Sequence, residues 1–229
     1  MKKLFSSIGR CLRWVWIHVA RLVLIILTYL LYSPQVVYED KKSFKFKRVK
    51  EPTVLTCNHL RGCDGAVISA LFYRSRIHSL AARKWYNKWY LRPILICGYS
   101  IPISPVGTSW LKESAHALEG GDSVLIFPEG RAVPGGRAMH PFKPGFLVLA
   151  RLSGAPILPC YMEGCYNRPF LKRLRIVVGT PYHPEPPEDG VFSHEYQQKQ
   201  CAILYQKTKE LQALLHQKRR KGRSEKENV

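Results

Sequence analysis

The stretch from Thr53 to Tyr73 reads TVLTCNHLRGCDGAVISALFY, and it predicts a strand, a tight loop and a helix in that order. Residues 53–57 are mostly apolar or β-branched, which is typical of a buried strand. Residues 64–73 carry apolar side chains at helical spacing, with Asp64 in the first turn. We therefore expect His59 to lie at the C-terminal end of a strand, with a carboxylate five positions later.

A second short string, Phe-Pro-Glu-Gly-Arg at residues 127–131, follows another apolar, strand-like run at residues 123–127. A histidine beside a carboxylate suits general-base chemistry, because the carboxylate fixes the ring tautomer and leaves the other ring nitrogen free to take a proton. An arginine in a turn, together with backbone N–H groups, suits an anion. The two strings together predict an enzyme that deprotonates a hydroxyl on a negatively charged acceptor.

Strand-like and helix-like segments alternate along the rest of the chain. Strands are expected at residues 36–50, 53–57, 77–82, 123–127, 157–162 and 174–179, helices at 64–73, 84–91, 110–119, 145–153 and 194–217, and a strand or short buried segment at 94–96. This alternation predicts an α/β fold, with a mostly parallel or mixed sheet flanked by helices. At 229 residues the chain suits one such domain, placed at residues 33–217 and followed by a basic, disordered tail at 218–229.

The chain is strongly basic, with 36 Lys and Arg residues against 16 Asp and Glu residues and a formal net charge of +20. Such a charge favours an anionic partner, and nucleic acid, an anionic membrane surface or an acidic substrate would each fit. No recognised nucleic-acid-binding motif is present, so we expect no nucleic acid partner. The seven cysteines do not form an even disulfide framework, which favours a reducing compartment.

Residues 1–32 are predicted to form a membrane-associated amphipathic helix that ends at Ser33-Pro34. The segment begins like a secretory signal, but no small-residue cleavage site follows its apolar part, so we expect it to be retained. Its polar side chains share one sector of a helical wheel, which favours a helix lying in the membrane interface. These side chains are Lys3, Ser6, Ser7, Arg10, Arg13, His18, Arg21 and Thr28. A membrane-spanning helix and an ordinary core helix remain open alternatives.

The spacing between His59 and Asp64 has a simpler explanation that must be weighed. His183 and Glu188 have the same spacing in a proline-rich connection, so the spacing alone proves little. Asp64 at the start of a helix can serve as a helix cap, a role that is compatible with holding the histidine ring. The functional interpretation therefore depends on the strand before the motif and on Gly62, which lets the chain turn.

The cysteines around His59 allow two further interpretations. Cys57, His59 and Cys63 would supply three metal ligands, although a second cysteine pair at matching spacing is lacking. Cys63 would alternatively act as a nucleophile, with His59 as its base, in a cysteine-dependent hydrolase. Both alternatives stay open at the level of the sequence.

Four ordered blocks of the sequence resemble one known family. The blocks are Asn-His-X₄-Asp at residues 58–64, Phe-Pro-Glu-Gly-Arg at 127–131, Phe-Lys-Pro-Gly at 142–145 and Ala-Pro-Ile-Leu-Pro at 155–159. Together they are similar to the glycerolipid acyltransferases, which include the 1-acyl-glycerol-3-phosphate and lysophospholipid acyltransferases. The resemblance covers residues 52–180.

The resemblance also implies a direct acyl transfer without a covalent enzyme intermediate. His59 would act as general base on the acceptor hydroxyl, Asp64 would orient it, and the oxygen would attack the thioester of acyl-CoA or acyl-carrier protein. No metal or cofactor is implied, and the expected partners are a lyso-lipid acceptor and a membrane lipid surface, at the cytoplasmic face of the cell membrane. The residues predicted to bind the acceptor are Asn58, Glu129, Gly130, Arg131 and Lys143.

Two departures from the family pattern concern the acceptor headgroup. Residues 101–105 read Ile-Pro-Ile-Ser-Pro where the family often has an Ile-Phe-Ile-Asp-Arg block, so an arginine that helps to hold glycerol phosphate is missing. Arg131 stands at the threonine position of the common Phe-Pro-Glu-Gly-Thr-Arg block, and Ala132 stands at its arginine position. The expected acceptor is 1-acyl-glycerol-3-phosphate, giving phosphatidate. The alternatives are another lyso-lipid, such as lysophosphatidylethanolamine or an aminolipid, and a noncatalytic membrane- or anion-binding protein.

Overall fold

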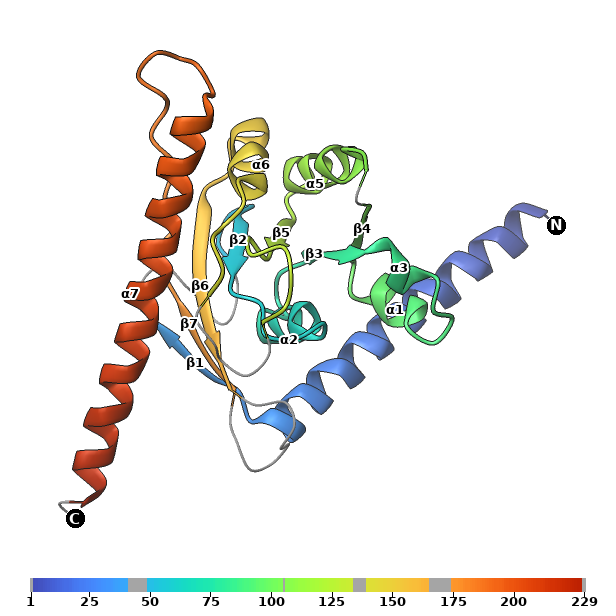
Figure 1. The fold of residues 1–229 in the computed structure, drawn as a ribbon. Coiled ribbons are helices and arrows are strands. Elements are labelled where there is room, and N and C mark those ends of the chain that lie inside the picture. The colour runs from blue at the N-terminus through green and yellow to red at the C-terminus, as the bar shows by residue number, and fades with distance from the viewer. Residues whose placement is uncertain (1, 41–48, 105, 134–138, 165–173, 228–229) are drawn as a thin grey trace.

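A seven-stranded sheet organises the molecule, with strand order β1-β7-β6-β2-β5-β3-β4 (Figure 1). The computed structural model describes residues 2–40, 49–104, 106–133, 139–164 and 174–227, with side chains from residue 15 to residue 218. The strands are β1 Gln35–Tyr38, β2 Val54–Cys57, β3 Ile77–Ala82, β4 Ile101–Ile103, β5 Ser123–Ile126, β6 Ile157–Glu163 and β7 Arg175–Val178. Neighbouring strands pair in parallel except β6 and β7, so the sheet is mostly parallel.

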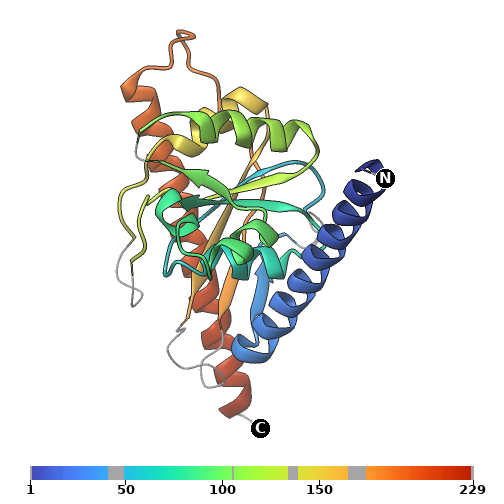
Figure 2. The same ribbon diagram turned by 90° about the vertical axis from the view of Figure 1, so that its right-hand side faces the viewer.

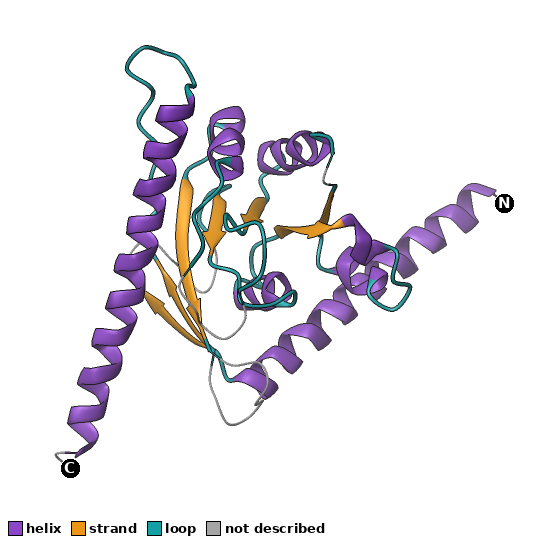
Figure 3. Ribbon diagram, in the orientation of Figure 1, coloured by secondary structure: helices purple, strands orange, loops and turns teal. Residues whose placement is uncertain are grey.

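Helices cover both faces of this sheet, as Figures 2 and 3 show. The helices are α1 Lys2–Tyr32, α2 Asp64–Leu71, α3 Arg83–Tyr86, α4 Arg92–Cys97, α5 Ser109–Glu119, α6 Gly145–Ser153 and α7 His194–Glu227. On one face α2 and the end of α1 pack on Leu55 and Leu125, and on the other α5, α6 and α7 pack on Val54 and Val124. Successive strand residues thus enter opposite core clusters, which explains why the central strands are mostly apolar and fully buried.

The α/β class predicted from the sequence is confirmed, and several segment predictions are corrected. The edge strand expected at residues 36–50 is β1, which ends at Tyr38, while residues 41–48 lie outside the described part of the chain. Residues 94–96 belong to helix α4 rather than to a strand, because Pro93 in the first turn suits a helix start. The helix expected at 84–91 is the short α3, which ends at Tyr86.

The last helix is longer than predicted. We expected it to end at Gln217 and to be followed by a disordered tail, but α7 continues as a helix to Glu227. Its middle part packs on the sheet through Leu204, Leu211 and Leu215, all of which are nearly fully buried. Lysine, arginine and glutamate are good helix formers, so a charged segment can extend a helix that is already anchored by packing.

The unit formed by strand β2, the loop after it and helix α2 explains how the fold positions that loop. All four residues of β2 are buried, and α2 begins at Asp64 directly after the loop. Gly65 lets α2 approach the sheet closely, since a Cβ atom built at this position would lie 2.9 Å from the Cβ atom of Ser79 on β3. Any larger residue would push α2 away from the sheet and carry the loop with it.

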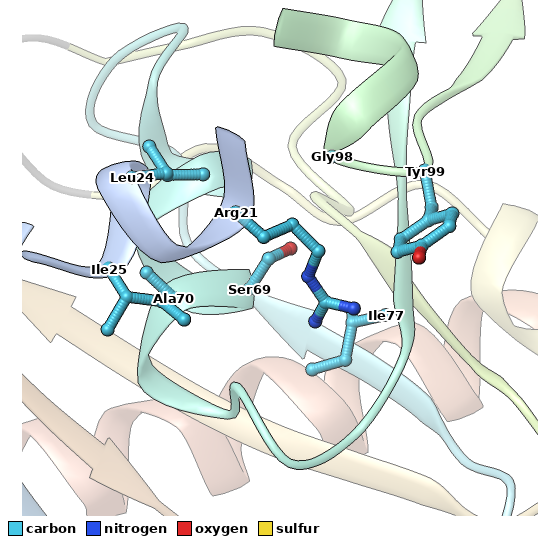
Figure 4. Close-up of a pocket in the computed structure, with 8 residues that line it drawn as sticks. All are labelled: Arg21, Leu24, Ile25, Ser69, Ala70, Ile77, Gly98 and Tyr99. Atoms are coloured by element: carbon cyan, nitrogen blue, oxygen red, sulfur yellow. The ribbon is translucent and has the colours of Figure 1, made fainter. Parts of the chain in front are cut away.

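Helix α1 lies against the domain with part of its polar side and exposes its apolar side. Thr28 is 3% exposed, and the Arg21 guanidinium donates to the carbonyl oxygen of Ser75 at 3.4 Å. Figure 4 shows the Arg21 side chain reaching from α1 into the space between Ser69 and Tyr99, and its Cζ atom lies 5.0 Å from the centre of the Tyr99 ring. The predicted polar sector therefore faces the protein at these two positions, while the side chains of residues 1–14 lie outside the described set.

The exposed side of α1 is strongly apolar. Its exposed large side chains are Val15, Trp16, Val19, Leu22, Val23, Ile26, Leu27 and Leu30. By length and composition the segment Val15–Tyr32 is able to cross a membrane, and only 6% of it is buried in the protein. This low burial is unlike that of an ordinary core helix and is typical of a membrane-associated segment.

Candidate active site

Two adjacent parallel strands bring the sequence motifs together. Strand β2 ends at Cys57 and leads to His59, and β5 ends at Ile126 and leads to Glu129. In the sheet, Thr56 of β2 lies opposite Ile126 of β5. Because the carboxyl ends of parallel strands lie at the same edge, the loops that follow them become neighbours. The site thus lies at the sheet edge where α/β proteins commonly bind ligands.

His59 and Asp64 form the central contact of the site. The Nδ1 atom of His59 lies 2.8 Å from Oδ2 of Asp64, and the carboxylate is fully buried whereas the imidazole is 17% exposed. The same Asp64 oxygen accepts backbone N–H bonds from Leu60 at 2.6 Å and Arg61 at 2.8 Å. The loop between strand and helix therefore wraps around the carboxylate, and this fixes its orientation toward the ring.

The His59 ring is also held by an aromatic contact. It stacks on the Phe127 ring with centroids 4.1 Å apart and an angle of 16° between the planes. The carboxylate fixes a proton on Nδ1, so Nε2 is the basic nitrogen. Among the residues that the structure describes, none hydrogen-bonds Nε2 of His59. The arrangement can therefore accept a proton from a bound hydroxyl, and buried Asp64 stabilises the imidazolium ion that results.

Glu129 joins the two loops of the site instead of facing solvent. Its side chain is 4% exposed; Oε1 accepts the backbone N–H of His59 at 2.8 Å, and Oε2 accepts the backbone N–H of His140 at 2.8 Å. Both oxygens are thus engaged by the protein. Each oxygen keeps a second lone pair, so the contact of Glu129 with the acceptor stays a prediction beside this structural role.

Asn58 has a similar role on the other side of His59. It is 4% exposed, and its amide donates to the carbonyl oxygen of Met162 at 2.9 Å while its side-chain oxygen accepts the Met162 N–H at 2.7 Å. These two hydrogen bonds tie the end of β2 to β6, and they continue the pairing of the two strands beyond the last backbone bond between them. Asn58, predicted to bind the acceptor, is therefore engaged with backbone.

The cationic part of the site is at the surface. Arg131 and Lys143 are exposed, and Gly130 between them has a positive φ of 70°, which glycine adopts without strain. A Cβ atom at Gly130 would lie 3.1 Å from the Lys143 Nζ atom, so the ammonium group lies directly over this turn. The Nη2 atom of Arg131 lies 3.0 Å from Nε2 of His140, a residue that the sequence motifs did not single out.

Comparison with known proteins shows the family of the chain. The Acyltransferase family model matches residues 35–163, which include both motif loops. The chain belongs to the Acyltransferase family. It is an enzyme distantly related to a 1-acyl-sn-glycerol-3-phosphate acyltransferase of Bacillus subtilis (strain 168), with 25% identity over 177 residues that cover 72% of this chain and 83% of that one.

A solved structure shares the fold of this acyltransferase. It is the crystal structure of the 1-acyl-sn-glycerophosphate acyltransferase PlsC from Thermotoga maritima, with a TM-score of 0.55 and 22% sequence identity. The match covers 82% of this chain and 75% of the other. At this identity the likeness concerns the fold alone, and it extends well beyond the residues of the family model.

The structure gives little support to the two alternative interpretations based on cysteine, a nucleophilic Cys63 and a metal site that includes Cys57. Cys63 is exposed at the surface, but partial desolvation and then the charge of Asp64 raise the pKa of its thiol, which is opposite to the activation of a nucleophile. Cys57 is buried, and burial, first of all, raises its pKa well above the usual value. Within the described ranges no group of three or more His, Cys, Asp or Glu side chains is placed to hold a metal ion.

Proposed function

We propose that this acyltransferase moves a fatty acyl group from acyl-CoA or acyl-carrier protein to the free hydroxyl of a lyso-glycerolipid, with 1-acyl-glycerol-3-phosphate as the acceptor and phosphatidate as the product. The observation that carries the proposal is the His59–Asp64 pair, with 2.8 Å between Nδ1 and Oδ2 and with Nε2 open to a ligand. The resemblance of the motifs to glycerolipid acyltransferases supports the choice of substrates.

The reaction requires a single base and no covalent enzyme intermediate. Nε2 of His59 takes the proton of the acceptor hydroxyl as the oxygen attacks the thioester carbonyl carbon. The new C–O bond forms, the C–S bond breaks, and the departing thiolate recovers the proton from the imidazolium. Asp64 holds the ring in the required tautomer and stabilises its charged form. Neither a metal nor a cofactor takes part in this scheme.

The remaining site residues divide into a binding and a positioning group. Arg131 and Lys143 are exposed cations next to the Gly130 turn, and we assign them to the anionic group of the acceptor. Glu129 and Asn58 are buried and bonded to backbone, so they position the His59 loop. This division revises the prediction in which all five residues bind the acceptor.

Both substrates carry long acyl chains, so the reaction takes place at a bilayer surface. The exposed apolar side of α1 suits an attachment to that surface, and the basic net charge of +20 suits an anionic leaflet. We place the enzyme at the cytoplasmic face of the cell membrane, where acyl-CoA or acyl-carrier protein is available.

A second acceptor class is favoured by one specific observation. Residues Ile101–Ile103 form β4, and Ser104 and Pro105 follow in the sequence where related proteins often carry an acid and an arginine, while the arginine of the second motif stands one position earlier, as Arg131. The anion site therefore contains one arginine fewer than the family pattern. A lyso-lipid with a smaller negative charge, such as lysophosphatidylethanolamine, needs fewer cationic side chains to balance the charge of its headgroup.

One experiment tests the function and identifies the headgroup. Purified protein is incubated with palmitoyl-CoA or palmitoyl-acyl-carrier protein and a panel of lyso-lipids that includes lysophosphatidate and lysophosphatidylethanolamine, and thiol release and product mass are followed. Release that depends on the acceptor and is lost in His59→Ala is the expected result. His183→Ala is the matched control, because His183 has the same spacing to an acid but lies in the exposed proline-rich connection. Absence of release with every donor and acceptor contradicts the proposal.

A further inference from the structure

The segment from Arg83 to Cys97 exposes an unusual number of aromatic and aliphatic side chains. Trp89 is 85% exposed, and Tyr90 and Ile94 are each exposed to about half of their surface, at 54% and 51%. Trp85 and Ile96 are also exposed. Single exposed apolar residues are common on soluble proteins, but five within fifteen consecutive positions mark an interaction surface.

This surface is continuous with the exposed side of α1. Helix α4 packs against α1, and Figure 1 shows the helices side by side at the end of the molecule far from α7. An open cavity of about 450 Å³ lies between them. It is lined by Trp16, Ile17, Trp89, Arg92, Pro93, Ile96 and Cys97. The tryptophans of the two segments therefore border one apolar hollow.

The charges of the segment indicate what covers it. Residues 83–97 contain four basic side chains and no acidic one, and all four, Arg83, Lys84, Lys88 and Arg92, are exposed. The Lys84 Nζ atom lies 5.3 Å from the centre of the Trp85 ring. Tryptophan and tyrosine side chains next to lysine and arginine suit the boundary between acyl chains and anionic headgroups. An acidic protein partner would not need the apolar face of α1 beside this segment.

We propose that residues 83–97 are a second membrane-contacting segment, which forms one docking surface for an anionic lipid bilayer with the outer side of α1. Trp89 enters the acyl-chain boundary, the four basic side chains contact lipid phosphates, and lipid tails fill the hollow between Trp16 and Trp89. The inference rests on the proposed function only in assuming that the exposed side of α1 contacts a membrane. Because one helix leaves the domain free to rotate about its axis, two attachment areas fix the orientation of the site toward the bilayer.

Trp89 itself reports on the contact. The full chain is bound to vesicles of phosphatidylglycerol and phosphatidylcholine in equal amounts, with and without bromine on the acyl chains, and tryptophan quenching is compared in wild type and Trp89→Phe. Phenylalanine keeps an apolar ring, so binding is retained while the Trp89 signal is removed. We expect the quenched fraction to fall in Trp89→Phe and to stay unchanged or rise in Trp110→Phe, because Trp110 packs against the core beside α6. An unchanged quenched fraction in Trp89→Phe overturns the proposal.

Vesicle affinity gives an independent readout. We expect Trp89→Ala to weaken binding by about tenfold or more, and Lys88→Gln and Arg92→Gln by about fivefold each. The matched controls are Leu152→Ala, an exposed leucine on α6, and Lys112→Gln, an exposed lysine on α5, and both should bind as wild type. Equal losses in variants and controls overturn the proposal. Neither readout requires turnover, so a membrane contact without acyl transfer would leave this inference standing and reject the proposed function.

Discussion

Glu129→Gln separates two roles for the glutamate of the second motif. If Glu129 holds the His59 loop to the loop of His140, the change should lower stability, because each oxygen of this buried side chain accepts a part-buried backbone N–H at 2.8 Å. The glutamine side chain has nearly the same shape, but it offers one acceptor oxygen and one NH₂ group. One of the two backbone donors would then face another donor.

The magnitude follows from these two bonds. An unsatisfied buried donor costs about 1–3 kcal/mol, and the remaining bond loses about 1 kcal/mol when its acceptor is no longer charged. Relief of the cost of burying a carboxylate offsets part of this loss. We expect the free energy of unfolding to fall by about 2–3 kcal/mol, which is a decrease in Tm of roughly 4–12 °C for a domain of this size.

Thermal unfolding and steady-state kinetics measure the two consequences in the same preparation. We expect kcat to fall by about 10- to 100-fold, since a displaced His59 loses its near-attack position. Glu119→Gln is the matched control, because Glu119 is exposed at the end of α5 and should leave Tm and kcat unchanged. An unchanged Tm with a raised KM for the acceptor would refute the positioning role and restore the role predicted from the sequence.

Three further substitutions test other parts of the site. Gly130→Ala places a side chain at a φ of 70° beside Lys143, so we expect a loss of about 1 kcal/mol in unfolding free energy and a raised KM for the acceptor. Cys63→Ser should keep turnover near that of the wild type, and a loss of turnover would favour the cysteine hydrolase. In the wild type, desolvation and Asp64 raise the pKa of the Cys63 thiol, so its alkylation by iodoacetamide should be slow at neutral pH and accelerate above pH 9. Asn58→Ala removes both hydrogen bonds to the Met162 backbone on β6, and we expect the free energy of unfolding to fall by about 2–4 kcal/mol in denaturant titrations. An unchanged value would show that this tie is dispensable.

Local sequence patterns were sufficient for the elements that place His59. The buried strand before it and the helix after it depend on periodicity and on turn residues, which lie within a few positions of one another. The antiparallel direction of β7 was not specified in this way, because a strand of four residues carries no mark of its direction. The sequence of α4 was ambiguous as well, because the three apolar residues 94–96 fit a strand and a helix equally.

The contacts of Glu129 and Asn58 could not be predicted because their partners are backbone groups far away in the sequence. The bond from His59 to Glu129 spans 70 residues, and that from Asn58 to Met162 spans 104. A motif shows which side chain is present but not which backbone donor reaches it. Likewise, the helical wheel of α1 correctly grouped Arg21 with Thr28, yet periodicity does not tell whether a polar sector faces water or another part of the protein.

The charge distribution of the site follows from these buried contacts. Asp64 is fully buried and Glu129 is 4% exposed, and backbone N–H groups of the two loops surround both carboxylates. Their charges are thus used to hold the loops and the His59 ring, while Arg131 and Lys143 remain exposed at the surface. A ligand that enters the site therefore meets the His59 ring and two exposed cations, while both acids are buried. This ordering of charges suits the anionic acceptor proposed above, because the two cations can hold its negative group while its hydroxyl lies near His59.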